Sequence, residues 1–251
     1  NLGIKALNFF IYIGGTFNLT VGTVFQIFVL PFRRKEWIVQ MYKIGVMSFP
    51  IVFMVALFTG MVLALQSAYQ LTKMNAQMYI SSLVALSMLR ELGPVLTALV
   101  IAGRVGASIT AELGTMKVSE QIDALRTLAA NPVKYLVVPR LLAGILMMPV
   151  LTVLADFIGV AGGYFISVNT LNINPGVYIG RSIDFVKVED IFDGLIKSFF
   201  FGLILSLVSC YNGFYAKGGA EGVGRAATTS VVMSSVLILV ADYILTSIMF
   251  K

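Results

Sequence analysis

Long apolar runs separated by short polar stretches dominate the chain. Such runs cover residues 44–69, 94–113, 136–166, 191–211 and 230–250. A transmembrane helix needs roughly 20 predominantly apolar residues, and only helices or closed barrels satisfy their backbone in lipid. The runs are continuous rather than alternating, which favours helices over barrel strands. The pattern predicts an all-α integral membrane protein with about five transmembrane helices.

The stretches between the runs predict shorter elements. A short apolar helix is expected over residues 78–89, ended by Arg90, Glu91, Gly93 and Pro94 before the second span begins. Residues 169–189 are expected to be a polar connection and residues 212–229 a Gly-rich loop. No internal repeat or second domain is visible, so residues 1–251 are interpreted as a single transmembrane domain.

Residues 1–30 are apolar but interspersed with polar side chains, and they lack the small-residue cleavage pattern of a signal peptide. We interpret them as an N-terminal helix lying in the membrane interface, an elbow helix. A sixth true span is the alternative.

Composition agrees with a membrane protein and adds an orientation. Hydrophobic residues make up 58% of the chain and charged residues 12%, against about 25% charged in soluble domains. Cytoplasmic loops carry an excess of Lys and Arg, and the net charge of +6 fits such a bias. The larger basic group lies on one side of the predicted spans: Arg33, Arg34, Lys35, Lys43, Lys117, Arg126, Lys134, Arg140, Lys217 and Arg225. This predicts a cytoplasmic N-terminus and, with five spans, a C-terminus outside.

Enzyme chemistry has little support in the sequence. The chain has no histidine and one cysteine, Cys210, so the commonest general base and metal ligand is missing. No phosphate loop of the GxxxxGK[ST] type, HExxH or GxSxG occurs. We therefore predict no catalytic residues, no metal site and no ATP binding by this chain alone.

The second predicted span combines small residues with a polar line. Small residues recur every four positions, which gives one helix a face for close packing against another helix of the same chain or of a second copy. They are Ala98, Ala102, Gly106, Thr110 and Gly114, with a neighbouring row of Gly103, Ala107, Ala111 and Thr115. Arg104, Ser108 and Glu112 form a polar line, interpreted as a structural ion pair or loop anchor rather than a transport site.

A compact amphipathic helix is predicted over residues 117–129. Val118, Ile122, Leu125 and Ala129 share one apolar face, Ser119 is the expected N-cap, and the remaining faces hold Lys117, Glu120, Asp123 and Arg126. Such a helix suits docking in a groove of a partner protein. Lying flat on the bilayer is an equal alternative.

Ionisable residues embedded in apolar runs are functional candidates. They are Arg90 and Glu91, taken as a pair, with Asp156, Lys197 and Asp242. A rise of 1.5 Å per residue places Lys197 roughly 9 Å and Asp242 roughly 12 Å below their outer helix ends. A Lys197–Asp242 pair is therefore expected, with Asp156 as a competing partner. These charges either line an outward-facing cavity for an amphiphile with a charged head or only neutralise one another.

Several motifs resemble the MlaE/YrbE permease family. They are Leu89-Arg90-Glu91-Leu92-Gly93-Pro94, Ala102-Gly103-Arg104-Val105-Gly106-Ala107, Ala111-Glu112-Leu113-Gly114-Thr115-Met116, Glu120-Gln121-Ile122-Asp123-Ala124-Leu125, Val138-Pro139-Arg140, and Ala226 with Thr228 and Thr229. The resemblance covers about residues 40–250, and residues 1–30 match loosely.

The resemblance implies a permease subunit of an ABC transporter that moves phospholipids or related lipids in a cell inner membrane. It implies a homodimer with a lipid cavity between the copies, open to the periplasm. A cytoplasmic ATPase subunit would bind ATP and Mg and would contact the coupling helix through Glu112, Val118, Glu120, Ile122, Asp123, Leu125 and Arg126. Arg90, Glu91, Lys197 and Asp242 would line the lipid cavity. An MCE-domain protein would carry lipid onward, and in some systems a STAS-domain protein binds the ATPase.

Two other classes remain as alternatives. An ion-coupled secondary transporter could use Asp156, Lys197 and Asp242 as a relay, although such folds usually show inverted repeats. A membrane scaffold without transport activity is the other alternative.

Overall fold

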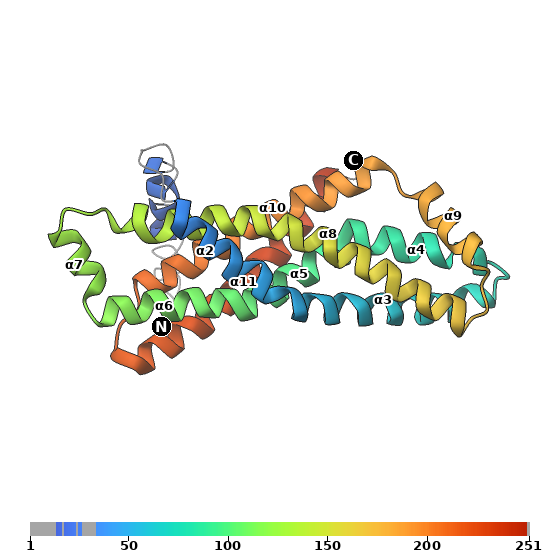
Figure 1. Ribbon diagram of the computed structural model, residues 1–251, viewed down its shortest axis with the longest axis horizontal. Helices are drawn as coiled ribbons and strands as arrows, with labels where there is room; N and C mark the ends of the chain where they lie inside the picture. Colours follow the sequence, from blue (N-terminus) through green and yellow to red (C-terminus); the bar gives the residue numbers. More distant parts are fainter. Residues whose placement is uncertain (1–13, 17, 24, 27–33, 250–251) are drawn as a thin grey trace, which may run out of the picture.

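The protein is described by a computed structural model that covers residues 14–16, 18–23, 25–26 and 34–249 (Figure 1). Five helical segments in this part of the chain are long and apolar enough to cross a membrane: Lys35–Thr72, Gln77–Val118, Val133–Asn169, Val188–Phe214 and Gly219–Met249. The regular elements described are all helical. The prediction of an all-α membrane protein with about five spans is confirmed.

The helices follow one another with short connections. The first span contains α2 (Arg34–Ile44), η1 (Val46–Ser48) and α3 (Phe49–Thr72); the second contains η2 (Gln77–Tyr79), α4 (Ile80–Ser87), η3 (Met88–Leu92), α5 (Gly93–Ile101), η4 (Ala102–Gly106) and α6 (Ala107–Val118). Next come α7 (Gln121–Thr127), η5 (Val133–Val137), α8 (Val138–Asn169), α9 (Pro175–Phe185), α10 (Val188–Phe214) and α11 (Gly219–Met249). Elements η3, η4 and η5 are π-helical turns.

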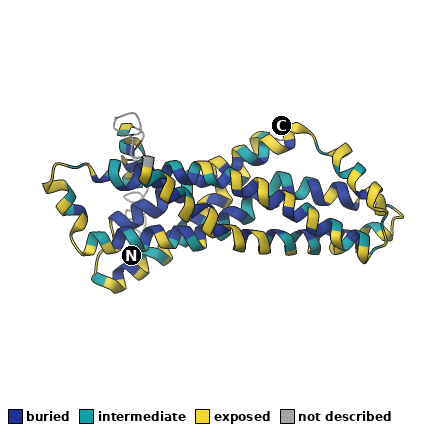
Figure 2. Cartoon of the chain, in the orientation of Figure 1, coloured by how far each residue is buried: buried dark blue, intermediate teal, exposed yellow. Residues whose placement is uncertain are grey.

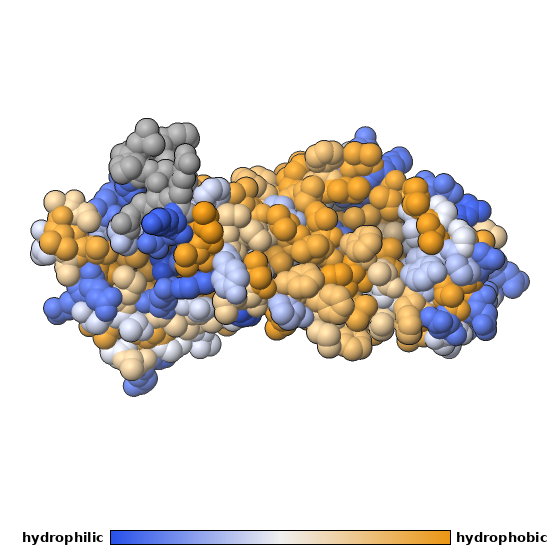
Figure 3. Space-filling view, in the orientation of Figure 1, coloured by the Kyte–Doolittle hydropathy of each residue, from blue (hydrophilic) through white to orange (hydrophobic). Residues whose placement is uncertain are grey.

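The spans form an elongated bundle with different structures at its two ends. Figure 1 shows α7 at one end, and the α3–α4 turn with α9 at the other. Helix α8 packs against α3 and α10, and α10 also packs against α6 and α11. The surface is mostly apolar around the half that contains α3, α4 and α8 and more hydrophilic at the two tips (Figure 3). This distribution suits a bundle whose long axis crosses a bilayer.

The small-residue row of the second span packs inside its own chain. Ala98, Ala102, Gly106, Thr110 and Gly114 are all buried, as the burial pattern in Figure 2 illustrates for the bundle interior. A side chain at Gly106 would meet Leu205 and Ser209, and one at Gly114 would meet Ala216 and Val223. The interpretation of internal packing is therefore correct for this row, whereas Gly103 in the neighbouring row faces open space.

Helix α11 packs against the bundle along one face and is exposed along the other. In its most apolar stretch of 18 residues, 11% of the residues are buried. Large side chains along the helix are exposed, namely Val232, Val236, Leu239, Val240, Tyr243, Ile244 and Ile248. In a membrane this face contacts lipid or another polypeptide.

Three sequence expectations about connections are wrong. The helix does not break over residues 90–94; it continues through the π turn η3 into α5. Residues 169–189 contain α9, whose N-terminus is capped by Asn174, the side chain of which accepts a hydrogen bond from the Gly176 N–H at 2.9 Å. The expected loop over residues 212–229 is mostly helical, because α10 continues to Phe214 and α11 begins at Gly219.

The N-terminal elbow prediction for residues 1–30 largely concerns residues outside the described part. Within that range, residues 14–16, 18–23 and 25–26 are helical. The choice between an interfacial helix and a sixth span therefore stays a prediction.

Candidate functional site

A buried lysine organises a charged cluster inside the bundle. Lys197 lies on α10, and its side chain has no exposed surface. Its Nζ lies 2.7 Å from Glu91 Oε2, 2.7 Å from Thr246 Oγ1 and 3.2 Å from Asp242 Oδ1. The second, fourth and fifth spans therefore meet at one ammonium group, and the predicted Lys197–Asp242 pair is confirmed.

The backbone of the second span explains why the lysine is held there. Pro94 has no N–H, so the carbonyl of Arg90, four residues earlier, loses its usual α-helical partner. Lys197 Nζ donates to that carbonyl at 3.0 Å. Gly194, one turn before Lys197, allows the close approach, because a Cβ there would collide with the Leu89 carbonyl oxygen. Lys197 thus supplies the hydrogen bond that Pro94 cannot donate to the neighbouring helix.

The cluster carries more negative than positive charge. One ammonium group faces two carboxylates, Glu91 and Asp242, whose side chains are 37% and 21% exposed. The Asp242 contact is an ion pair without hydrogen-bond alignment, since Asp242 Oδ1 has no hydrogen-bond partner in the described residues. Charges at membrane depth are costly unless paired or hydrated. The exposed carboxylate surface can therefore accept a cationic or hydrogen-bond-donating group from outside the chain.

Arg90 and Glu91 do not pair with each other, contrary to the sequence interpretation. Arg90 Nε donates to Asp190 Oδ1 at 2.7 Å, and Glu91 binds Lys197. Adjacent residues on a helix do not face each other, so each finds a separate partner. Asp190 is also fixed by the Lys187 N–H, which donates to its Oδ2 at 2.8 Å.

Asp156 does not compete for Lys197. It lies on α8 with 7% exposure, and its Oδ1 accepts no hydrogen bond from the described residues. The Gly93 backbone packs closely against that oxygen. The depth argument placed Asp156 at a suitable level, but it could not tell which face of α8 the residue occupies.

A second ionic cluster lies toward the α7 end. Glu112 on α6 binds Lys43 of α2 at 3.3 Å and Arg140 of α8 at 2.9 Å. Arg140 is buried and donates to the Leu136 carbonyl at 2.7 Å. The interpretation of Glu112 as a structural ion pair is confirmed. Arg104, from the same polar line, donates to the Ser48 hydroxyl at 2.5 Å.

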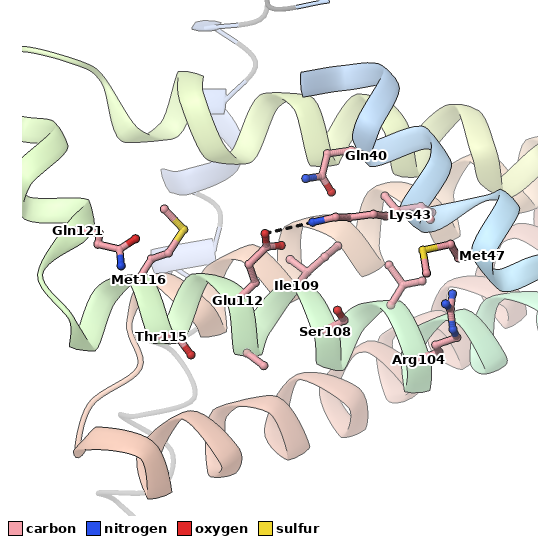
Figure 4. Close-up of a pocket in the computed structure, with 13 residues that line it drawn as sticks. Gln40, Lys43, Met47, Arg104, Ser108, Ile109, Glu112, Thr115, Met116 and Gln121 are labelled. Carbon is pink, nitrogen blue, oxygen red and sulfur yellow. Dashed lines mark hydrogen bonds and ion pairs between the residues drawn. The ribbon is translucent and has the colours of Figure 1, made fainter. Parts of the chain in front are cut away.

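Lys43, Glu112 and Arg104 border a cavity of about 710 Å³ between α2 and α6. Figure 4 shows Lys43 reaching across it to Glu112, with Ser108 on α6, Arg104 on the preceding η4 and Gln121 at the start of α7. The cavity therefore adjoins the predicted coupling segment. Movement of α7 relative to α6 would change its shape.

The coupling segment differs in detail from the prediction. Helix α6 continues to Val118, and α7 covers Gln121–Thr127 rather than residues 117–129. Ser119 is not the N-cap, since its hydroxyl donates to the Thr115 carbonyl at 2.7 Å. Glu120 takes the capping position with a left-handed φ of 59°. The left-handed backbone at Glu120 separates α6 from α7, so α7 begins in a different direction.

Ile122 and Asp123 tie α7 to its own chain. Ile122 is fully buried and Leu125 is half-buried, while Val118 and Leu128 are exposed. Asp123 binds Lys117 at 2.6 Å and Arg126 at 3.3 Å. The hydrogen bond from Lys117, with the nearby positive charges, holds the pKa of the Asp123 carboxyl below its usual value.

Sequence reasoning missed four residues of these clusters: Thr246, Asp190, Lys43 and Arg140. Thr246 follows Asp242 by four positions and so shares its helix face, a signal that could have identified it. Asp190 lay between the expected polar connection, residues 169–189, and the fourth apolar run, which begins at residue 191. The partners of Glu112 required the packing of three helices, which spacing does not give.

A bundle of five apolar spans, with a charged cluster inside it and a short solvent-exposed helix at one end, has the layout of a transporter permease. The chain belongs to the MlaE family, whose model, described as Permease MlaE, matches residues 37–248. A probable ABC transporter permease of Rickettsia typhi is 49% identical over 84% of this chain and 82% of its own length. A probable ABC transporter permease of Synechocystis is 43% identical over 87% and 83%.

The chain is also similar to the intermembrane phospholipid transport system permease protein MlaE of Haemophilus influenzae, at 38% identity over 99% of this chain and 96% of that protein. Family and relatives agree that this is a multi-pass membrane permease of the ABC transporter type. It is a transport subunit rather than an enzyme.

Proposed function

We propose that this permease moves phospholipid between a cell inner membrane and a periplasmic MCE-domain carrier. A separate cytoplasmic ATPase subunit, which binds ATP and Mg, would drive the movement, and a STAS-domain protein would bind that ATPase in some assemblies. The proposal rests on family membership and on one observation: a fully buried Lys197 is shared by Glu91, Asp242 and Thr246 within apolar spans.

The cluster suits a zwitterionic headgroup. Glu91 and Asp242 together exceed the charge of Lys197 and stay partly exposed, so they can pair with a lipid ammonium group. Arg90 is bound to Asp190 with 34% of its side chain exposed, and it can approach a phosphate. The phospholipid function in the name of the Haemophilus relative supports this choice of substrate.

Helix α7 is proposed as the contact with the ATPase. Glu120, Asp123 and Arg126 would meet the partner, together with the exposed apolar side chain of Val118, while Ile122 and Leu125 hold α7 to the bundle. A push on α7 would pass through the Lys117–Asp123 pair to α6, and from there to Glu112 and its partners. ATP hydrolysis in the partner would thereby change the packing of the spans.

A second copy of the chain is proposed to face the exposed side of α11. Apolar side chains along α11 are open, and Asp242 lies on the same helix. Two copies joined near this helix would enclose the partly exposed carboxylates between them and form a lipid cavity. With the basic residues near α7 on the cytoplasmic side, the N-terminus would be cytoplasmic, and the C-terminus and the cavity mouth periplasmic.

The proposal is tested by reconstituting the permease with its ATPase subunit in phospholipid vesicles. ATP-dependent transfer of a fluorescent phospholipid to an acceptor is measured for the parent and for Glu91→Gln. Glu221→Gln is the matched control, because that side chain is 82% exposed and pairs within α11. Slower transfer with Glu91→Gln alone is expected. Equal transfer by all three proteins, or failure to assemble with an ATPase, would refute the proposal.

A further inference from the structure

A second cavity lies between α4, η3, α8, α9 and α10. Its volume is about 370 Å³, and its walls are mostly aliphatic, including Leu89, Val160, Ile183 and Leu195. Helix α9 is fixed over this region by Tyr178, whose hydroxyl donates to the Val160 carbonyl at 3.2 Å. The volume falls in the range of small-ligand sites.

Two polar groups in this apolar lining lack a hydrogen-bond partner in the described part of the chain. Asp156 and Ser182 both border the cavity. Asp156 is 93% buried, and neither its Oδ1 nor the Ser182 hydroxyl forms a hydrogen bond with the described residues. A buried polar group without a hydrogen bond is costly. Apolar walls bordered by two polar side chains are the pattern of a small-ligand site.

The mouth of the cavity opens sideways. Phe157 and Ile183, which line it, are 77% and 69% exposed. Both belong to the apolar surface of the bundle, so the opening faces the hydrocarbon of a surrounding bilayer. A ligand would enter from the membrane rather than from water.

We propose that this cavity binds one amphiphile whose head donates hydrogen bonds, either a hydroxyl or an ammonium group. The head would donate to Asp156 and reach Ser182, and the hydrocarbon chain would lie along Leu89, Val160 and Leu195. None of the residues that line this cavity belongs to the Lys197 cluster, and the proposal is independent of the proposed phospholipid function.

Tryptophan quenching tests the site without a transport assay. A reporter chain carries Phe157→Trp at the cavity mouth and Trp37→Phe, which removes the single native tryptophan. The chain is placed in nanodiscs and titrated with dibrominated octadecanol, octadecylamine or methyl stearate. Saturable quenching by the alcohol or the amine is expected, and their relative affinities identify which head is preferred. Methyl stearate, which has no donor, should bind about ten-fold more weakly.

Variants of the reporter chain locate the binding. Asp156→Leu should weaken binding of the alcohol or amine about ten-fold. Leu195→Phe should weaken saturable binding by taking up cavity volume, and it adds no second tryptophan. Asp184→Leu is the matched control, since it makes the same exchange at an exposed aspartate of α9 and should change nothing. If Asp156→Leu does not fold, Ser182→Ala and the comparison with methyl stearate decide.

Two results would overturn the proposal. One is equal quenching by all three probes, which would mean partition into the bilayer only. The other is unchanged affinity after Asp156→Leu or after Leu195→Phe.

Discussion

Lys197 donates a hydrogen bond to the main-chain carbonyl of Arg90, with 3.0 Å between Nζ and the oxygen. Pro94 leaves that carbonyl without its α-helical donor, so a side chain from the fourth span completes the hydrogen bonding of the second. The same ammonium group neutralises Glu91 and Asp242. The hydrogen bond to this main-chain carbonyl and the neutralisation of the two carboxylates therefore depend on one residue.

Replacing this lysine should destabilise the bundle. Lys197→Met leaves two carboxylates without a cation, and the free energy of unfolding should fall by about 3 kcal/mol, the lower end for breaking a buried pair, because both carboxylates keep partial exposure. Reversible unfolding in mixed micelles measures the change. Lys217→Met, at an exposed lysine, should have little effect. Adding Glu91→Gln and Asp242→Asn to Lys197→Met should recover most of the loss; further loss would contradict this account of the cluster.

The role of Pro94 predicts coupling between two sites. Pro94→Ala restores an N–H that can reach the Arg90 carbonyl, so Lys197→Met should cost about 1 kcal/mol less in the Pro94→Ala background. A double-mutant cycle of unfolding free energies gives this difference. Strict additivity would show that the carbonyl does not depend on the lysine.

Gly194 should be intolerant of even one methyl group. Gly194→Ala places a Cβ against the Leu89 carbonyl oxygen, and pushing α10 away should cost about 1–3 kcal/mol of unfolding free energy. Gly224→Ala is the control, since a Cβ there meets open space and should stabilise α11 by up to about 1 kcal/mol. Similar values for the two variants would argue against the close approach.

The two partners of Glu112 should differ in importance. Lys43 is 48% exposed, so Lys43→Ala should change the free energy of unfolding by no more than about 1 kcal/mol. Glu112→Ala leaves the guanidinium of Arg140, 5% exposed, without a counter-charge, and should cost about 3 kcal/mol. Chemical unfolding of both variants tests the order, and a larger loss from Lys43→Ala would reverse it.

The attachment of α7 should respond to acid. The Asp123 carboxyl has a pKa below its usual 3.8 when bound to Lys117. A lowered pKa stabilises the folded state above the usual value, and the contribution is lost as pH falls through the folded pKa. A spin label at Leu128→Cys should keep its mobility from about pH 8 to about pH 5 and gain mobility only below pH 3.8. The native Cys210 is buried and should stay unlabelled.

Asp123→Asn provides the comparison for this acid effect. The asparagine side chain does not ionise, so the label should be mobile at every pH in that variant. Glu221→Gln, at an exposed carboxylate of α11, is the control and should keep the pH profile of the parent. Identical pH profiles for Asp123→Asn and the parent would assign the change to another group.

Hydropathy was sufficient to predict the five spans, because each run is long and apolar. The Lys197–Asp242 pair followed from depth along antiparallel helices, a one-dimensional quantity that sequence spacing measures well. The partner of Arg90 and the isolation of Asp156 depend on which face each residue occupies. The π turn at Met88–Leu92 contains Arg90 and changes the face that Arg90 occupies, and no sequence pattern marked this turn.

Helix α9 escaped prediction although a signal was present. Asn174 followed by Pro175 is a typical N-cap and first helical position. The surrounding asparagines and glycine suggested a loop, and the helix is too short to stand out by hydropathy. Its position over α8 could be learned only from the fold, through Tyr178.

The π turn at Ala102–Gly106 changes the rotation of the second span about its own axis. Positions four apart overshoot by about 40° per step on an ordinary α-helix, since each turn takes 3.6 residues. The wider turn takes up part of that drift, and the row from Ala98 to Gly114 stays buried throughout. Deleting one residue from this turn would rotate the part of the helix between the turn and α7 by about 100° about its axis. Glu112 would then leave Arg140, while the Lys197 cluster, on the other side of the turn, would stay in place.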